Sequence, residues 1–166
     1  MTTAGRHAGL AGKTVVVAGT DPAIVGIARA LVREGTLLAV VSADHHLVAA
    51  VTRIAETAGT PMIGLTSDPS AAEVWERNAP HIEQRLGPID IAIAIGPAEL
   101  RELIAATFLP DMRRRHHGVF VEAGVDVPAR ELGDGVLHRF VHAADTDADT
   151  LADSVMDALR QRATQG

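Results

Sequence analysis

The chain has 166 residues, a mass of 17.4 kDa and a formal charge of −6, with a single lysine and neither cysteine nor tyrosine. Disulfide frameworks, thiolate metal sites and cysteine nucleophiles are therefore excluded, as is a tyrosine acid or base. Any lysine chemistry would have to use Lys13. The length suits one domain over residues 1–166, in which we expect residues 1–12 to form a flexible tail. With 47% hydrophobic but only 2% aromatic residues, the core must be aliphatic.

The acidic balance disfavours nucleic-acid binding, because a negative surface repels a phosphate backbone. The dense basic cluster, 113–115 followed by two histidines, is typical of a helix C-terminus, where cations meet the negative end of the helix dipole. The first dozen residues lack the apolar segment of a secretory signal, and no apolar run approaches the roughly 20 residues that span a bilayer. We therefore expect a cytoplasmic protein with neither nucleic-acid nor membrane partners.

Apolar runs alternate with helical stretches along the chain, which is typical of an α/β fold. The expected strands cover residues 14–18, 37–42, 61–65, 89–95, 118–123 and 136–142. The expected helices cover residues 22–34, 44–58, 67–86 with a cap at 67–69, 98–115, and a last stretch from the acidic cluster 145–149 to about 162. The pattern predicts a three-layer, Rossmann-like, doubly wound domain with a mostly parallel sheet.

Four segments resemble the short-chain dehydrogenase/reductase family, whose members bind NAD or NADP on a Rossmann sheet. They are L-A-G-K-T-V-V-V-A-G at 10–19, I-A-R-A-L-V-R-E-G at 27–35, L-G-P-I-D-I-A-I-A at 86–94 and F-L-P-D-M-R-R-R-H-H-G-V-F-V at 108–121. They follow the family's order over roughly residues 10–125. The chain is therefore identified as a shortened and degenerate member.

The resemblance implies a cofactor site built from residues that follow three of the strands: Gly19, Thr20, Asp21, Asp44 and Gly96. The family pattern T-G-x-x-x-G-x-G would need glycines at 19, 23 and 25, but only Gly19 is present, and Pro22 removes a backbone donor. Asp44 would either bind a ribose hydroxyl or cap the helix that follows it. NAD or NADP is the implied cofactor, but the altered pattern leaves the cofactor undetermined.

The family's Asn-Ser-Tyr-Lys catalytic set has no counterpart here. The chain has no tyrosine, Lys13 precedes the first strand at the wrong edge of the sheet, and Asn78 falls within the third helix. Only a loop, Gly124–Gly135, separates the last two strands, so the helix that carries Y-x-x-x-K in the family is missing. These departures predict a non-catalytic or interaction subunit. The alternative is an NAD(P)-dependent oxidoreductase, or another small-ligand enzyme, with a non-standard site at the carboxyl edge of the sheet.

Candidate polar groups at that edge are Asp21, Asp44, His45, Glu122, Asp126 and His142. Glu122 would be either a partly buried base or an edge carboxylate that is solvated or paired with an arginine. No metal site is expected, because the histidine pairs 45–46 and 116–117 fall at opposite edges of the sheet. The D-T-D-A-D run at 145–149 lacks the glycine and glutamate of a calcium-binding loop and instead favours a helix start.

The helix at 98–115 carries more apolar surface than one stripe facing a sheet requires, with Leu100, Leu103, Ile104, Phe108, Leu109 and Met112. In the family the corresponding helix pairs with its counterpart in another subunit. We therefore expect a homo-oligomer, or a hetero-oligomer with a full-length relative. The alternative is that the loop Gly124–Gly135 folds over the extra apolar surface.

Overall fold

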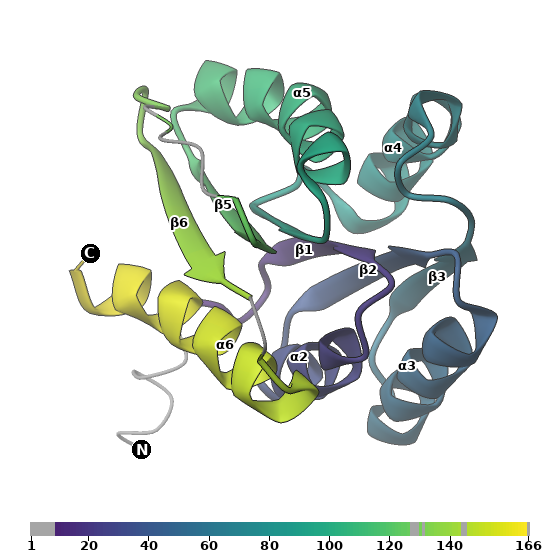
Figure 1. Ribbon diagram of the computed structural model, residues 1–166. Helices are drawn as coiled ribbons and strands as arrows, with labels where there is room; N and C mark the ends of the chain where they lie inside the picture. Colours follow the sequence, from purple (N-terminus) through teal and green to yellow (C-terminus); the bar gives the residue numbers. More distant parts are fainter. Residues whose placement is uncertain (1–8, 127–129, 131, 144–145, 166) are drawn as a thin grey trace.

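The computed structural model describes residues 9–126, 130, 132–143 and 146–165, which form a parallel sheet with helices on both faces (Figure 1). The strands are β1 (Thr14–Gly19), β2 (Leu37–Ser42), β3 (Met62–Thr66), β4 (Ile91–Ile95), β5 (Gly118–Gly124) and β6 (Val136–His142). The helices are α2 (Ala23–Arg33), α3 (His45–Ala58), α4 (Ala72–Leu86), α5 (Ala98–Arg115) and α6 (Ala148–Gln165). The α/β interpretation of the sequence is therefore confirmed.

The sheet has the strand order β3-β2-β1-β4-β5-β6, and all its strand pairs are parallel. The chain first builds outward from β1 to β3, then returns to place β4 on the other side of β1. This reversal of direction makes the sheet doubly wound, as predicted, and creates a switch point between β1 and β4.

Two largely aliphatic cores lie on the two faces of the sheet, with α2, α3 and α6 over one face and α4 and α5 over the other (Figure 1). The second core also holds Trp75, Phe108 and Phe120. The side chains of β1 alternate between the two cores, so that Val15 and Val17 enter the first core while Val16 and Ala18 enter the second. This explains why the strands read as unbroken apolar runs: both faces of the sheet are buried.

Helices α2 and α6 approach each other closely at Gly26. A Cβ atom at this position would lie 3.1 Å from the Cβ of Ala152. The glycine therefore allows the C-terminal helix to pack directly against α2.

One of two predicted helix starts differs in the structure, and the other is as predicted. Helix α4 begins at Ala72, later than the predicted cap at 67–69, because Asp68 accepts hydrogen bonds from the backbone and hydroxyl of Ser70 and forms a separate turn. Helix α6 begins beside the acidic cluster as predicted, and the Asp147 carboxylate accepts from the backbone N–H of Thr150 at 2.8 Å. The first residue of that cluster, Asp145, lies outside the described residues.

The N-terminal segment is described from residue 9 onward, so residues 1–8 of the predicted tail lie outside the described part. Within residues 9–12 the chain turns against the domain: Leu10 is buried in the core and the backbone N–H of Gly12 donates to the carbonyl of Gly35.

Helix α5 does not present the uncovered apolar strip expected from its sequence. Its large apolar residues are buried, except for the half-buried Leu103. Leu132, from the connection between β5 and β6, is buried in the same core, and its carbonyl accepts from Nε of Arg113 at 3.2 Å. At Leu132, the connection therefore packs against the helix as the alternative expects. Among the described residues, Val125 is the large hydrophobic side chain that stays exposed.

The basic cluster lies at the end of α5, as predicted from the helix dipole. The helix closes at Arg115, and His116 follows in a left-handed conformation at φ 53°. No helix in the described part of the chain is both long and apolar enough to cross a membrane.

Candidate functional site

The carboxyl ends of the central strands meet at the switch point, where ligands bind in sheets of this kind. Gly19 has φ +148°, and a Cβ atom there would lie only 2.3 Å from the carbonyl oxygen of Ile95. A Cβ atom on Gly124 would lie 2.8 Å from the carbonyl oxygen of Gly96. Glycine is therefore required at these strand ends because the backbones of β1, β4 and β5 approach each other so closely.

The turn between β1 and α2 is the place where the resemblance puts the pyrophosphate of a dinucleotide. Here Asp21 accepts from the backbone N–H of Ala23 at 2.8 Å and its carbonyl accepts from Ile24 at 3.0 Å. The carbonyl of Pro22 accepts from Val25 at 3.1 Å, and Pro22 itself has no N–H. The donors that would bind a phosphate at this helix end are thus already used, and the carboxylate of Asp21 adds a repulsive negative charge. Thr20, beside it, is exposed.

Asp44 caps helix α3. Its carboxylate accepts from the backbone N–H groups of His46 and Leu47 at 3.0 and 3.3 Å, while its own N–H donates to the hydroxyl of Ser42. The capping alternative is therefore observed, and ribose binding by Asp44 stays a prediction. His45 and His46 are exposed, with their rings 4.0 Å apart.

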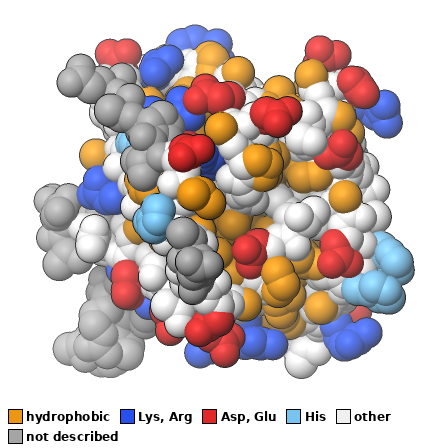
Figure 2. All heavy atoms as spheres, viewed as in Figure 1, with side chains coloured by type: hydrophobic (Ala, Val, Ile, Leu, Met, Phe, Trp, Pro, Cys, Tyr) orange, Lys and Arg blue, Asp and Glu red, His pale blue; other side chains and the backbone are white. Residues whose placement is uncertain are grey.

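A cavity of about 410 Å³ lies at the carboxyl ends of β4 and β5. It brings together three groups singled out in the sequence, Asp21, Gly96 and Asp126, with Arg101 from the first turn of α5. Thr20 and Asp44 do not line it. In the view of Figure 2, hydrophobic side chains gather in the middle of the face between the α5 and α2 sides, with acidic side chains around them.

Arg101 belongs to a buried charge cluster beneath this cavity. Its guanidinium lies 3.5 Å from the Glu122 carboxylate, and the two residues are 2% and 0% exposed. The second carboxylate oxygen of Glu122 accepts from Nε of Arg130 and lies 2.7 Å from Nε2 of His138. Arg130 also pairs with Glu102 at the surface, at 2.8 Å. One carboxylate thus serves two arginines and a histidine.

The surroundings of Glu122 fix its protonation state. Burial alone would raise the pKa of this carboxyl, but the hydrogen bonds from His138 and Arg130, with their positive charge, outweigh burial and hold the pKa below its ordinary value. A fully buried, ionised and multiply paired carboxylate is a weak base. The structure therefore favours the paired alternative for Glu122, in a more deeply buried form than the sequence indicated.

Arg101, Arg130 and His138 were not identified from the sequence as members of this cluster. The register of β5 against β6 pairs Phe120 with His138, and their rings stack 5.8 Å apart, which directs the imidazole towards Glu122. That register depends on the path of the β5–β6 connection, which the sequence does not reveal. His142, one of the two histidines that were singled out, is exposed at the end of β6.

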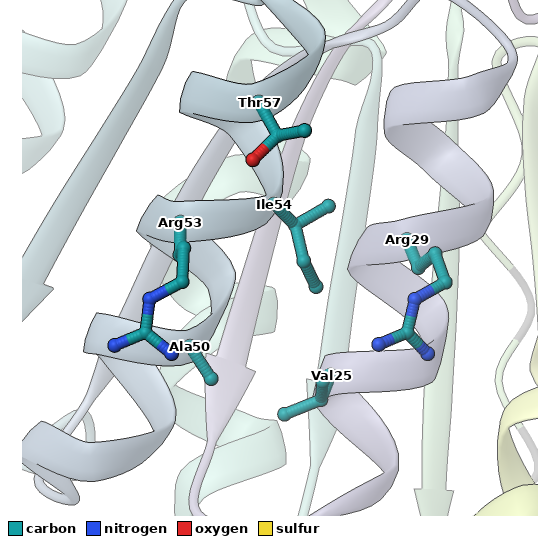
Figure 3. A pocket seen from close by; sticks show the side chains of 6 residues that line it. All are labelled: Val25, Arg29, Ala50, Arg53, Ile54 and Thr57. Carbon is teal, nitrogen blue, oxygen red and sulfur yellow. The ribbon is translucent and has the colours of Figure 1, made fainter.

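A second hollow, of about 420 Å³, runs between α2 and α3 (Figure 3). Its floor is formed by Val25, Ala50 and Ile54, and the arginines of the two helices, Arg29 and Arg53, lie on opposite walls. Val25 occupies a position where the family pattern has glycine. Its side chain points into this groove, so that the departure from the pattern contributes to the surface between the two helices.

No group of three or more side chains suited to hold a metal ion occurs within the described ranges.

Several solved structures share this fold. A metagenomic short-chain oxidoreductase in complex with NADP aligns with a TM-score of 0.74 and 18% identity over 92% of this chain and 93% of that one. Alcohol dehydrogenase from the archaeon Thermococcus sibiricus, complexed with 5-hydroxy-NADP, aligns with a TM-score of 0.70 and 18% identity over 89% of this chain and 90% of that one.

NAD+-bound xylitol dehydrogenase aligns with a TM-score of 0.60 and 14% identity over 70% of this chain and 54% of its own, so the present chain spans about half the length of that enzyme. No protein-family profile matches the sequence, and neither does any curated protein. The strand order, the helix layers and these structural neighbours agree: the chain has the fold of the short-chain dehydrogenases/reductases, which confirms, at the level of the fold, the resemblance predicted from its sequence.

Proposed function

We propose that this protein is a non-catalytic subunit with the short-chain dehydrogenase/reductase fold, which pairs with itself or with an active homologue. The observation that carries the proposal is the start of α2. Three successive N–H groups there, of Ala23, Ile24 and Val25, already donate to Asp21 or Pro22. A dinucleotide would have to displace these bonds and approach a carboxylate, so binding of NAD or NADP is expected to be weak or absent.

The missing catalytic groups support the same conclusion. The chain has no tyrosine. Lys13 directly precedes β1, at the amino edge of the sheet, and Asn78 donates from α4 to the carbonyl of Val74. None of the described residues between β5 and β6, at 125, 126, 130 and 132–135, is helical. The scaffold is thus present without the tyrosine–lysine pair that the resemblance implies for proton transfer beside a nicotinamide.

The outer face of α5 is the surface we assign to pairing. A shallow hollow of about 240 Å³ on this face is lined by Ala105, Ala106, Leu109 and Pro110 between the charged residues Glu102, Arg113 and Arg130. Small apolar residues flanked by both signs of charge suit close packing of a partner helix, with ion pairs at the margin. The family resemblance implies pairing through the corresponding helix.

Calorimetric titration with NADH and NADPH tests the cofactor half of the proposal. We expect no heat of binding at ligand concentrations of about 1 mM. The variant Asp21→Ser removes the negative charge but keeps a hydrogen-bond acceptor for the helix end, and is the matched variant in which weak binding would reappear. Micromolar binding by the unaltered protein would contradict the proposal.

Native mass spectrometry of the full chain, alone and with co-purified partners, tests the pairing half. We expect a complex that Ala106→Arg disrupts, because this exposed alanine lines the hollow on α5. Ala49→Arg, at an exposed position on α3, is the control and should leave the complex intact. A monomer under all these conditions would refute pairing.

One observation favours the second candidate, a small-ligand or NAD(P)-dependent enzyme that uses the carboxyl edge. The cavity at the ends of β4 and β5 is lined by a buried arginine together with two carboxylates, Asp21 and Asp126. Polar groups that converge in a cavity at this edge are typical of binding sites. Turnover of NADH or NADPH with a panel of small carbonyl compounds would support this candidate over the non-catalytic one.

A further inference from the structure

The cavity at the ends of β4 and β5 receives the N-terminus of a long helix. Helix α5 has 18 residues, and Pro97 and Ala98 at its start line the cavity. Pro97, at the N-cap position, has no side chain that accepts a hydrogen bond, and no side-chain cap is formed. The first N–H groups of α5 and the positive end of its dipole are therefore available to a ligand in this cavity.

Arg101 supplies a second, independent donor at the same place. Its side chain is 98% buried, and Nη1 donates to the carbonyl of Asp126 at 2.7 Å and to Glu122 at 3.5 Å. Its Nε, however, finds no acceptor among the residues that the structure describes. Nε lies 3.1 Å from the position of a Cβ atom on Gly124, which also lines the cavity. Buried donors are nearly always paired, so this one indicates an acceptor beyond those that the described residues supply.

The charges around the cavity define the ligand further. Glu122 is shared with Arg130 and His138 and lies at the long distance of 3.5 Å from Arg101, so it compensates the charge of Arg101 only in part. Asp21 and Asp126 also line the cavity, and their carboxylates would repel an anion that carries no hydrogen-bond donor. A matching ligand therefore carries an acceptor for Arg101 and, close to it, a hydrogen-bond donor for a carboxylate.

We propose that this cavity binds a small carboxylic acid that bears a neighbouring hydroxyl or amino group. The carboxylate would accept from Nε of Arg101 and from the N-terminus of α5, while the hydroxyl or amino group would donate to Asp21 or Asp126. The volume of about 410 Å³ suits such a molecule. The carboxylate of the ligand is bound at the start of α5 and by Arg101, not by the turn between β1 and α2, so the proposal does not require that the protein bind a dinucleotide or a partner subunit.

Nitrogen-edited NMR titration of the full chain tests the proposal, with serine and lactate as the probes. Serinamide and lactamide are the matched controls, because each keeps the donor but lacks the carboxylate. We expect the acids to shift the backbone signals of Ala98 to Leu100 and the Nε–H signal of Arg101, and the amides to leave them unchanged. Equal shifts with acids and amides, or no shift with any probe at about 10 mM, would overturn the proposal.

Two pairs of variants separate binding from folding. Ala98→Asp places a carboxylate at the helix start, where it favours the fold but repels the ligand, and should weaken binding by about 10-fold or more. Ala49→Asp, at an exposed position of α3 that does not line the cavity, is its control. Arg101→Lys removes the Nε donor and should also weaken binding, whereas Arg130→Lys, at the same Glu122 carboxylate but outside the cavity, should not. Binding by Ala98→Asp as tight as by Ala49→Asp would refute the site.

Discussion

Replacing Glu122 by glutamine tests whether the buried charge cluster stabilises the domain. The substitution keeps the size of the side chain but removes the negative charge that faces Arg101, Arg130 and His138. Because Arg101 is only 2% exposed, its charge would then be largely removed from water and would lack the carboxylate that faces it. The folded state loses an ionic partner, whereas the unfolded state is hardly affected.

The expected loss is large for a single substitution. Removing one partner of a buried ion pair typically costs about 3–5 kcal/mol, compared with a total stability of about 5–15 kcal/mol for an ordinary domain. For a chain of this length each kcal/mol lowers the melting temperature by about 2–4 °C, so Glu122→Gln should lower it by about 6–20 °C.

Glu102→Gln is the matched control, since it is the same chemical change at a carboxylate that pairs with Arg130. Glu102 is 59% exposed, and exposed ion pairs contribute only about 0–1 kcal/mol. Calorimetric melting and urea unfolding of both variants measure the difference. If Glu122→Gln is as stable as Glu102→Gln, the carboxylate of Glu122 does not compensate the buried arginine, and our account of the cluster is wrong.

Three further outcomes are expected. In the folded protein the pKa of Glu122 is held below its ordinary value of 4.5, so the unfolded chain binds the proton more readily than the folded one. The ionised Glu122 therefore stabilises the folded state fully above pH 4.5, and this contribution is lost as the pH falls through the folded pKa. Melting curves below pH 5 should accordingly depend less on pH in Glu122→Gln. Gly19→Ala should cost more than about 3 kcal/mol in urea unfolding because its Cβ meets the carbonyl of Ile95 at 2.3 Å, whereas Gly12→Ala, with open space around it, should cost about 1–2 kcal/mol. Asp44→Ala removes a helix cap and should cost about 1 kcal/mol by the same measurement, and an unchanged stability would contradict the capping role.

The sequence predicted the fold because its signals are local. Unbroken apolar strands such as T-V-V-V-A are typical of a sheet with both faces buried. Residues such as Pro22 at a helix start and Gly59 at a helix end indicate the helices between the strands. The start of α4 was predicted too early because the Asp68 side chain bonds to Ser70, and a turn and a helix cap use the same residue types.

The candidate site was predicted only in part. Gly19 ends β1, and Asp21 and Gly96 lie within two residues of a strand end, so their place at the carboxyl edge could be inferred. Arg101, by contrast, reads as an ordinary surface residue of a helix, and its burial depends on how α5 lies over β5 and β6. A lone arginine within an apolar helix face, opposite a glutamate within an apolar strand, was the one available signal. The extra apolar residues of α5 were expected to stay uncovered, and this prediction was wrong for the same reason. Leu132 packs in the same core, and it comes from a connection whose sequence has no regular pattern.

The short connection between β5 and β6 has a consequence for the order of folding. Neighbouring parallel strands are usually joined by a helical crossover, which separates their pairing residues widely in the chain. Here Gly118 pairs with Val136, whereas Val15 in the centre of the sheet pairs with Ile91. Closing the shorter loop costs less entropy, so the β5–β6 pair is expected to form early and the central β1–β4 pair late. The half of the molecule that carries the buried charges would then be assembled before the switch point closes beside it.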